Sequence, residues 1–406
     1  MQSASGMSPN KVDDRHAGLK FTLQSTSGMQ SASENVLQSQ SIGTSSKSSG
    51  PLARSSKMQR PLRAVSVGPC LVRGGAEQWL IYLNRFLDPR RVQIVRAIAT
   101  NPEFDDPAFL VDVPIPVEIG SAEAIQRAAR ESDVMLCWGI ELDDMLGTER
   151  PKLCVYIAHG EGDWTRLMLS RSQQSFDHVV AVSNRVRERV CNGYSTSVIY
   201  NGVDTARLGT TRCSQSIRRE YGFTDRDFVL GYVGRFSAEK QAHLLIEAAA
   251  QLPARFKVLF VGWGSGRQSL LELANECIPG RYAFASADRY LGDYYRMMDA
   301  FCLTSNQEGF SLALLEAMWC ERTVIVTPVG CVPEIIRDRV NGIVVEDNGP
   351  SIAAAVKLVD EFPNWARGVA AEGRLFADRH GHALRMASQY EDLLESLWLD
   401  RYGVAA

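Results

Sequence analysis

Residues 300–319 read AFCLTSNQEGFSLALLEAMW, and this stretch contains the signals of a strand, a loop and a helix in that order. Its first six residues form a short apolar run, which is typical of a buried strand. A loop with Gly309 follows, and Ser311 is placed to cap the helix that begins after it. The stretch therefore predicts a strand–loop–helix unit, with Glu308 in the loop and Glu316 on the helix.

The same alternation of short apolar runs and amphipathic stretches extends through most of the chain. Candidate strands in the first half cover 64–68, 92–99, 133–138, 152–158, 178–183 and 197–202. Candidate strands in the second half cover 228–234, 257–262, 300–305, 323–327 and 342–346. Short buried strands that alternate with helices indicate parallel sheets covered on both faces. The expected fold class is therefore α/β, with two Rossmann-like doubly wound parallel sheets.

The pattern restarts near residue 203, which divides the chain into segments. About a quarter of residues 1–60 are serine and no periodicity runs through them, so we expect a disordered Ser-rich tail. We expect one Rossmann-like domain over 61–203 and a second over 204–383. Residues 384–406 have the pattern of a long amphipathic helix. In such a chain the expected ligand site is a cleft between the two domains.

Composition limits the classes of function. A formal net charge of -3 disfavours a nucleic-acid binder. Most of the 9 cysteines lie in apolar runs without a CxxC pair, which favours reduced, buried thiols over the alternatives of a disulfide framework or a structural zinc. No apolar run reaches the ~18 residues of a membrane helix, and the N-terminus lacks the pattern of a secretory signal.

These observations predict a cytoplasmic protein. The end of the Ser-rich tail is mildly basic, so a weak contact with the inner face of a membrane is an alternative to a solvated linker. The basic residues concerned are Arg54, Lys57, Arg60 and Arg63.

The two glutamates of the opening stretch lie on either side of a predicted helix N-terminus. The free amides of such a terminus bind anions. With an anion between them, Glu308 and Glu316 can accept hydrogen bonds from the hydroxyls of a sugar and of a ribose. Judged on spacing alone, a loop charge and a surface helix charge remain the alternative.

Two cations follow the first strand of the second half, in the segment VGRFSAEKQAHLLIEAA. The strand ends in Gly234, Arg235 follows it, and Lys240 begins the next helix. Two fixed positive charges suit a diphosphate leaving group, whose charge grows as the glycosidic bond breaks. A solvated pair of cations at the start of a helix remains the alternative.

Glycine-rich turns and one histidine complete the set of candidates. Gly74 and Gly75 precede a helix, and Gly262 belongs to a similar turn in the second half, so the backbone can approach a phosphate at both places. Plain tight turns are the alternative. His159 directly follows a buried strand, where a structural histidine is the alternative. The string DRD at 225–227 is interpreted as a polar turn, so no metal site is expected.

Taken together, these segments resemble the GT-B-fold retaining glycosyltransferases of family 4, the glycosyl transferases group 1. VGRFSAEKQAHLLIEA is similar to the family element G-R/K-x-x-x-x-K-G-x-x-x-L-I-E-A, and SNQEGFSLALLEAM is similar to its E-x7-E element. RGGAE, HGEGDW, AVSNRVRE, IYNGVD, TPVGCVPEII and NGIVV also occur in family order. The resemblance covers about residues 64–400 and implies two domains that face a central cleft. It also implies that the C-terminal helix, residues 384–406, crosses back to the N-terminal domain.

The resemblance implies a role for each matching position. Arg235 and Lys240 would contact the donor diphosphate. Glu308 and His159 would hold the donor sugar, and Glu316 would bind the ribose. The remaining donor-binding positions, mainly backbone contacts, are Gly74, Gly75, Gly234, Gly262, Gly309, Phe310 and Ser311.

The implied activity is that of a hexosyltransferase acting with retention of configuration. It would move a sugar from a nucleoside-diphosphate donor to a hydroxyl of a saccharide or lipid-linked acceptor, in polysaccharide or glycoconjugate biosynthesis. Neither a metal nor another cofactor is implied, and the leaving diphosphate would help to deprotonate the acceptor. The alternatives are another enzyme on this fold, such as a sugar-nucleotide epimerase or a phosphorylase, or a non-catalytic relative that binds a glycan or a partner.

Several positions depart from the family pattern. Trp319 and Glu321 stand where a small residue and a Gly are common. Gln241 and Cys331 also stand where a Gly is common. Because Trp319 is bulky and close to Glu316 in the sequence, we expect it to reshape the donor pocket.

Overall fold

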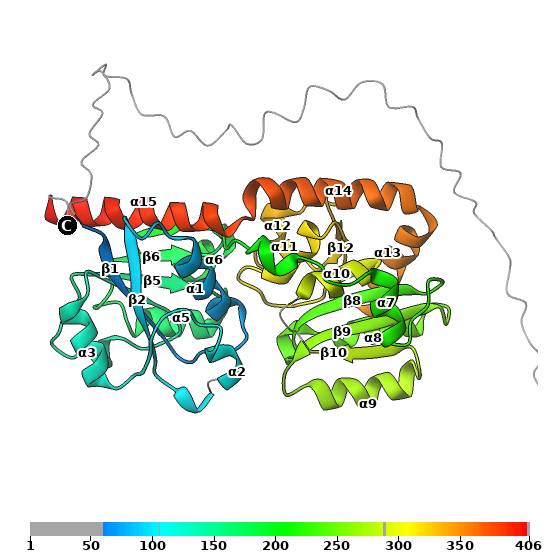
Figure 1. Cartoon of the computed structure of the whole chain (residues 1–406), viewed down its shortest axis with the longest axis horizontal. Coiled ribbons are helices and arrows are strands. Elements are labelled where there is room, and N and C mark those ends of the chain that lie inside the picture. Colours follow the sequence, from blue (N-terminus) through cyan, green and yellow to red (C-terminus); the bar gives the residue numbers. More distant parts are fainter. Residues whose placement is uncertain (1–59, 105, 287–289, 404–406) are drawn as a thin grey trace, which may run out of the picture. The chain divides into compact units, whose positions relative to one another are not determined.

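Two parallel β-sheets form the framework of the protein (Figure 1). The computed structural model describes residues 60–104, 106–286 and 290–403, all of which belong to one compact unit. The Ser-rich tail expected for residues 1–60 lies outside the described residues, apart from Arg60 at its end.

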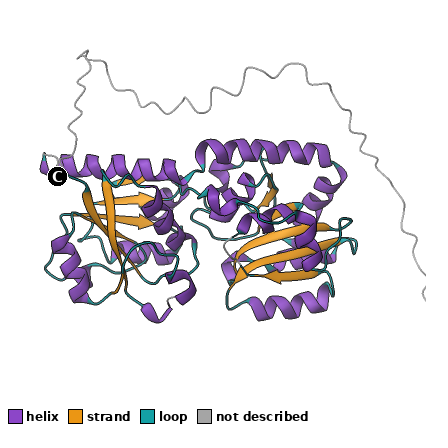
Figure 2. Cartoon of the chain, viewed as in Figure 1, coloured by secondary structure: helices purple, strands orange, loops and turns teal. Residues whose placement is uncertain are grey.

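The first sheet has seven parallel strands in the order β3-β2-β1-β4-β5-β6-β7. Figure 2 draws the strands in orange and the helices around them in purple. The strands are β1 (Leu62–Gly68), β2 (Val92–Ala99), β3 (Val117–Ile119), β4 (Val134–Cys137), β5 (Leu153–Ala158), β6 (His178–Ala181) and β7 (Thr196–Val198). Central strands such as β5, LCVYIA, are buried at every residue because helices cover both faces of the sheet. The strand order reverses between β1 and β4, and this reversal is the topological switch point of the sheet.

Short helices connect these strands. They are α1 (Gly75–Phe86), α2 (Pro107–Leu110), α3 (Ala122–Glu131), α4 (Asp143–Leu146), α5 (Asp163–Ser170), α6 (Asn184–Val190) and two 3-10 turns, η1 (Pro102–Phe104) and η2 (Thr205–Leu208). The start of α3 shows the local logic. The Ser121 side chain accepts a hydrogen bond from the amide of Ala124, and the residues buried behind this cap recur at helical spacing.

The second sheet has six parallel strands in the order β10-β9-β8-β11-β12-β13. The strands are β8 (Phe228–Arg235), β9 (Phe256–Trp263), β10 (Tyr282–Ala285), β11 (Ala300–Leu303), β12 (Thr323–Val326) and β13 (Ile343–Val344). The accompanying helices are α7 (Ser214–Glu220), η3 (Ala238–Lys240), α8 (His243–Ala250), α9 (Arg267–Cys277), α10 (Leu291–Met297), α11 (Leu312–Trp319), α12 (Val332–Ile335) and α13 (Gly349–Glu361). We call each sheet with the helices packed on it a lobe.

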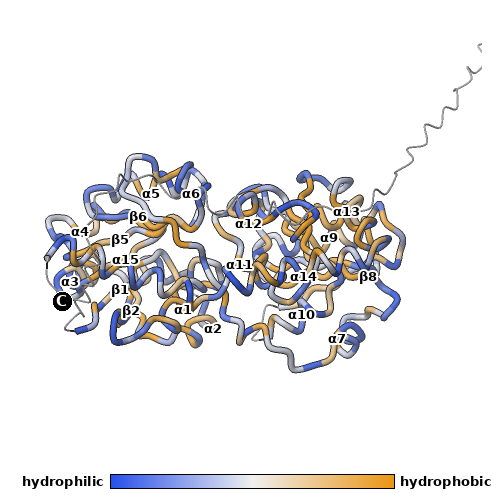
Figure 3. The backbone as a smooth tube through the Cα atoms, turned by 90° about the horizontal axis from the view of Figure 1, so that it is seen from above, coloured by the Kyte–Doolittle hydropathy of each residue, from blue (hydrophilic) through white to orange (hydrophobic). Residues whose placement is uncertain are grey.

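The expected fold class, two doubly wound parallel sheets, is confirmed. Figure 3 shows hydrophobic stretches along the inner strands, such as β5 and β6, and hydrophilic stretches in the outer loops. The sequence did not indicate β3 and β10. Both are short strands at the edge of a sheet and are only partly buried, so they lack the continuous apolar run that marks the inner strands.

The last two helices, α14 (Pro363–His380) and α15 (Ala383–Tyr402), connect the lobes. Helix α14 packs on α11 of the second lobe, whereas α15 packs on α1 of the first lobe. Arg91 fixes α15 in place with three ion pairs, at 2.8 Å to Glu391, 2.9 Å to Asp392 and 2.5 Å to Glu395. The chain therefore returns to the first lobe after the second sheet is complete.

Candidate functional site

Lys240 and Glu308 form an ion pair beyond the carboxyl ends of β8 and β11. The Lys240 Nζ lies 2.7 Å from the Glu308 Oε1, and the two side chains are 21% and 9% exposed. The Ser305 hydroxyl donates to the same oxygen at 2.8 Å. Because the described residues make both of these bonds to Oε1, the Oε2 of Glu308 can accept a hydroxyl from a ligand.

Arg235 lies at the end of β8 and faces both lobes. Its guanidinium is 3.1 Å from the Glu239 carboxylate and half exposed to solvent. It also lies within electrostatic reach of Glu77 on the first turn of α1. Burial raises the pKa of Glu77 to about 7, and the charge of Arg235 opposes that rise. The first lobe thus brings a buried carboxyl to the cation predicted to bind a diphosphate.

The glycine-rich turn before α1 meets the second lobe at the same place. The Trp263 Nε1, at the end of β9, donates to the backbone carbonyl of Arg73 at 3.0 Å. A Cβ at Gly74 would lie 2.3 Å from the Glu77 carboxylate, whereas a Cβ at Gly75 would meet nothing within 4 Å. A side chain at position 74 would therefore displace the Glu77 carboxylate, and Gly75 leaves open space in front of the turn.

The ends of the neighbouring strands β8 and β9 are also in close backbone contact. Gly262 has a φ of 146° and a Cβ there would lie 2.0 Å from the carbonyl oxygen of Gly234. A side chain at position 262 is excluded by both the backbone conformation and the contact.

His159 follows β5 and is surrounded by aromatic rings. Its ring centroid lies 5.1 Å from that of Trp79 and 6.3 Å from that of Trp138. Burial lowers the pKa of His159 to about 3, so the imidazole is neutral near pH 7. Its Nε2 is buried and has no hydrogen-bond partner among the described residues.

The loop that carries Glu308 is in contact with the His159 loop. A Cβ at Gly309 would lie 1.8 Å from the backbone oxygen of His159. The amide of Glu308 also points at the carboxylate of Glu161, at 3.5 Å. Three of the residues predicted for the donor sugar, His159, Glu308 and Gly309, are therefore brought together.

Glu316 is buried in a separate set of contacts. The Tyr295 hydroxyl donates to its Oε2 at 2.7 Å. Burial raises the pKa of Glu316, and the charge of Arg207 and the bond from Tyr295 oppose that rise. Glu308 and Glu316 share no partner among the described residues, so the two glutamates predicted for the sugar and for the ribose lie in separate sets of contacts.

The residues between Glu308 and Glu316 make most of their contacts with other residues of the protein. Phe310 packs on Tyr200 with ring centroids 5.5 Å apart. The Ser311 hydroxyl accepts from the amide of Leu314 at 3.3 Å and so caps α11. Burial raises the pKa of the Cys331 thiol, and the backbone N–H of Ser311 faces that sulfur and opposes the rise. The Ser311 amide, predicted to face phosphate, therefore faces a thiol in this structure.

Two carboxylates connect the lobes beside these loops. Glu161 lies 2.5 Å from the Nε of Arg185. Glu334, on α12 of the second lobe, accepts from the amides of Asn184 and Arg185 at 2.9 and 2.8 Å. It also accepts from the Tyr200 hydroxyl at 2.6 Å. Glu334 therefore satisfies the first free amides of α6 in the other lobe.

Sequence reasoning missed Glu77, Glu161, Arg207 and Tyr295 as members of this region. Glu77 and Glu161 lie inside the RGGAE and HGEGDW motifs, so the sequence pointed to their positions. It did not show that their side chains are buried. Arg207 and Tyr295 carry no local signal, because they reach Glu316 from distant parts of the chain.

Trp319 is not placed as expected. Its ring packs under the guanidinium of Arg374, which lies 4.1 Å from the ring centroid, and against His382. These contacts are with α14 and the start of α15, so Trp319 does not line the site. Two other departures are backbone features, since Glu321 and Gln241 adopt φ values of 57° and 46° where the family commonly has Gly.

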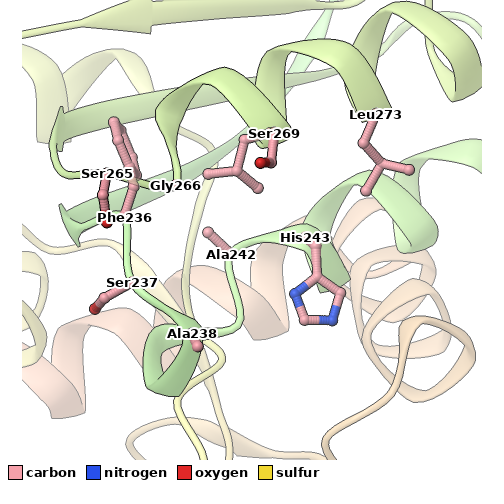
Figure 4. A pocket seen from close by; sticks show the side chains of 10 residues that line it. Phe236, Ser237, Ala238, Ala242, His243, Ser265, Gly266, Ser269 and Leu273 are labelled. Carbon is pink, nitrogen blue, oxygen red and sulfur yellow. The ribbon is translucent and has the colours of Figure 1, made fainter.

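A surface pocket of about 450 Å³ lies between the loop after β8 and helix α9 (Figure 4). Ser237, His243 and Ser269 surround it together with apolar side chains. The Ser237 hydroxyl is engaged by Glu239 at 2.6 Å, the same carboxylate that pairs with Arg235. This pocket therefore adjoins the cation site through Glu239.

Possible metal ligands, thiols and long apolar helices bear on the alternatives that the sequence left open. Within 60–104, 106–286 and 290–403, no three His, Cys, Asp or Glu side chains are grouped so that they could hold a metal ion. All 9 cysteines are free thiols, six of them buried. None of the described helices combines the length and the apolar character needed to cross a membrane.

Comparison with known proteins supports this picture. Residues 214–364 match the family model of the glycosyl transferases group 1. The chain is 29% identical over 227 residues to N-acetyl-alpha-D-glucosaminyl L-malate synthase of Bacillus anthracis, covering 53% of this chain and 59% of that protein. It is 32% identical over 180 residues to D-inositol 3-phosphate glycosyltransferase of Geodermatophilus obscurus, covering 40% of each. The chain thus spans about half the length of these relatives.

Solved structures show the same fold. HepE of Anabaena, solved in complex with UDP and glucose, has a TM-score of 0.72 and 21% identity, with 82% of this chain and 100% of that chain covered. The sucrose-phosphate synthase of Thermosynechococcus elongatus has a TM-score of 0.68 and 18% identity, with 83% and 100% covered. The two-lobed GT-B arrangement expected from the sequence is therefore confirmed.

Proposed function

We propose, from the premise that the chain belongs to the glycosyl transferases group 1 family through residues 214–364, that it is a hexosyltransferase. It transfers a sugar from a nucleoside-diphosphate donor to a hydroxyl acceptor. The observation that carries the proposal is the Lys240–Glu308 ion pair, whose loop touches the His159 loop of the other lobe. A cation, a carboxylate with a free oxygen and a neutral imidazole then surround one sugar.

Donor binding changes the partner of Lys240 in this proposal. Arg235 and Lys240 contact the diphosphate, and Glu308 keeps Lys240 oriented until the donor arrives. Negative charge on the diphosphate grows as the bond to the sugar breaks, so fixed cations stabilise the transition state more than the ground state. The open space in front of Gly75 supports an approach of the phosphates from the first lobe.

The donor sugar and the ribose hydrogen-bond to different carboxylates. Glu308 accepts a sugar hydroxyl at Oε2, because Ser305 stays bonded to its Oε1 after Lys240 has turned to the diphosphate. Glu316 accepts a ribose hydroxyl at Oε1, because its Oε2 is taken by Tyr295. His159 contacts the same sugar as Glu308 through its buried Nε2. Backbone groups at Gly234, Gly262, Gly309 and Phe310 complete the donor site, whereas the amide of Ser311 faces the Cys331 thiol.

The reaction proceeds with retention of configuration and without a metal. The departing diphosphate takes the proton of the acceptor hydroxyl on the face where the sugar bond breaks. Segment 61–203 holds the saccharide or lipid-linked acceptor, and segment 204–383 holds the donor. We infer that the protein works in polysaccharide or glycoconjugate biosynthesis, in the cytoplasm or at the inner face of a membrane.

The donor is tested first by thermal unfolding with UDP-, GDP- and ADP-sugars. A bound donor raises stability by mass action, by about 2.7 kcal/mol when its concentration is about 100 times its Kd. UDP-glucose is the first probe, since HepE was solved with UDP and glucose. Absence of a shift with every nucleotide sugar contradicts the proposal.

A matched pair of lysine variants tests the site. Lys240→Ala should abolish the shift given by the bound donor, whereas Lys357→Ala, on the exposed face of α13, should keep it. Addition of a chelator should leave transfer unchanged. Loss of transfer in chelator contradicts metal independence but not sugar transfer itself.

A further inference from the structure

His159 sits in a cage of buried aromatic side chains from separate elements. Trp79 on α1 and Trp138 after β4 are 0% and 3% exposed. Both rings meet His159 edge to face, with interplanar angles of 68° and 85°. Tyr390 of α15 supports Trp79 from behind, at a centroid distance of 5.6 Å.

The cage occupies the topological switch point of the first sheet. Gly68 ends β1, and a Cβ there would lie 2.3 Å from the six-membered ring of Trp138. The indole of Trp138 therefore lies over the end of β1, where an open sheet of this type commonly binds a ligand. In this lobe, protein side chains fill that position and leave His159 at their border.

Polar atoms in the cage are left without partners. The Nε2 of His159 and the Nε1 of Trp138 are both buried, and neither has a hydrogen-bond partner within the described part of the chain. A buried polar atom without a partner is costly, so its presence at a site requires a reason. A ligand hydroxyl facing the Nε2 of His159 supplies one.

We propose that Trp79 and Trp138 are positioning residues, which fix the imidazole of His159 in one orientation and keep it unprotonated for contact with the donor sugar. The proposal deepens the function proposed above, since the sugar is the partner of His159 there. Edge-to-face contacts restrict ring rotation because the positive ring edge prefers the negative face of its neighbour.

The charged groups around His159 are engaged elsewhere. Glu161 pairs with Arg185, and Glu308 pairs with Lys240. Burial is the cause that lowers the pKa of His159 to about 3. Tyr390, behind Trp79, is itself buried, and burial raises its pKa. The aromatic enclosure, rather than a nearby cation, therefore accounts for the neutral imidazole.

The test compares three buried tryptophans. Trp79→Leu and Trp138→Leu remove a ring from the cage, and Trp79→Phe restores an aromatic edge. The control is Trp398→Leu on α15, because Trp398 is 6% exposed, also has a buried Nε1 without a described partner, and packs on Tyr402 rather than His159.

The first readout is the pKa of His159 by NMR in the full chain, which has 6 histidines. The His159→Gln spectrum identifies the signal. In both cage variants we expect this pKa to rise from about 3 toward its ordinary value of 6.5. Trp79→Phe should return it toward the wild-type value, and Trp398→Leu should leave it unchanged. An unchanged pKa in both cage variants, or an equal rise in Trp398→Leu, overturns the proposal.

The second readout is transfer from UDP-glucose as a function of pH. The cage variants should lower kcat by roughly tenfold with a small change in KM, the pattern of lost orientation. Their activity should also fall on the acid side, where His159 now takes up a proton. Altered pKa values with unchanged kcat and pH profile overturn the positioning role. If wild-type protein binds no nucleotide sugar, the proposed function fails, while the pKa readout still decides the cage.

Discussion

Gly309 packs so closely on His159 that a Cβ at position 309 would lie 1.8 Å from the histidine's backbone oxygen. The two residues come from different sheets, so this contact sets the distance between the Glu308 loop and the first lobe. A single methyl group is therefore enough to separate the residues proposed to hold the donor sugar.

Gly309→Ala should lower transfer by about tenfold or more, equivalent to ~1.4 kcal/mol in the barrier, because the loop must move away from His159. The matched control is Gly368→Ala on α14, where a Cβ meets nothing within 4 Å. That change should raise stability by about 1 kcal/mol, since alanine favours a helix interior more than glycine. Steady-state kinetics and thermal unfolding of both variants provide the check. Full activity in Gly309→Ala contradicts the role assigned to this contact.

Lys240 and Glu308 should be energetically coupled. Glu308→Gln and Lys240→Met each remove one charge from a pair that is mostly buried, so each single variant leaves an unpaired charge. The double variant should be less destabilised than the sum of the two, with an interaction energy of about 1–3 kcal/mol. Urea unfolding of the four proteins measures this energy. Additive effects would show that Lys240 and Glu308 lie close together without an energetic interaction.

Glu77 should make stability depend on pH. Its pKa is raised from 4.5 to about 7 in the folded chain, so between these values the folded state binds more protons than the unfolded state. Stability should therefore fall as pH rises from 4.5 to about 7, and then level off. The loss is on the order of 3 kcal/mol, at ~1.4 kcal/mol per pKa unit.

Glu77→Gln should remove this dependence, because an amide does not titrate. Urea unfolding at pH 5 and pH 8 compares the two proteins. The variant and the wild type should differ most at pH 8, with the variant the more stable. An equal slope in both proteins would show that another group titrates.

Glu321→Gly should stabilise the protein. Glu321 has a φ of 57°, a conformation that a non-glycine residue adopts at a cost of roughly 1–2 kcal/mol, whereas glycine adopts it freely. Part of this gain is offset because glycine is more flexible in the unfolded chain, so a net gain of about 0.5–1 kcal/mol is expected. Thermal unfolding measures it, and Glu321→Ala, which keeps the Cβ, is the control. A stabilised alanine variant would point to the charge instead of the backbone.

The sequence predicted the elements that have strong local signals. The apolar run before Glu308 and the cap at Ser311 placed β11 and α11 within a few residues. The pairing of Lys240 with Glu308 was within reach, since both follow strands whose ends meet at one edge. The electrostatic interactions of Glu77 with Arg235 and of Arg207 with Glu316 were not predictable. More than a hundred residues separate each pair, and sequence periodicity carries no information over such a separation.

Side-chain direction was the second limit. Proximity in sequence placed Trp319 beside Glu316, but its ring is held by Arg374 of α14. The packing of α14 on α11 decides that direction, and it depends on residues about fifty positions later. Similarly, the exposure of Ser311 to phosphate was inferred without knowing that Cys331 lies against its amide.

The three ion pairs of Arg91 hold α15, the last helix of the described chain, against the first lobe. This has a consequence for the order in which the lobes fold during synthesis. Helix α15 leaves the ribosome only after the entire second lobe, yet it covers α1 of the first lobe. During translation, Trp79 and its neighbours on α1 stay exposed until α15 is synthesised. The second lobe can therefore fold before the first is complete. A fragment that ends before residue 383 is thus expected to expose this apolar face and to aggregate, although every strand of both sheets is present.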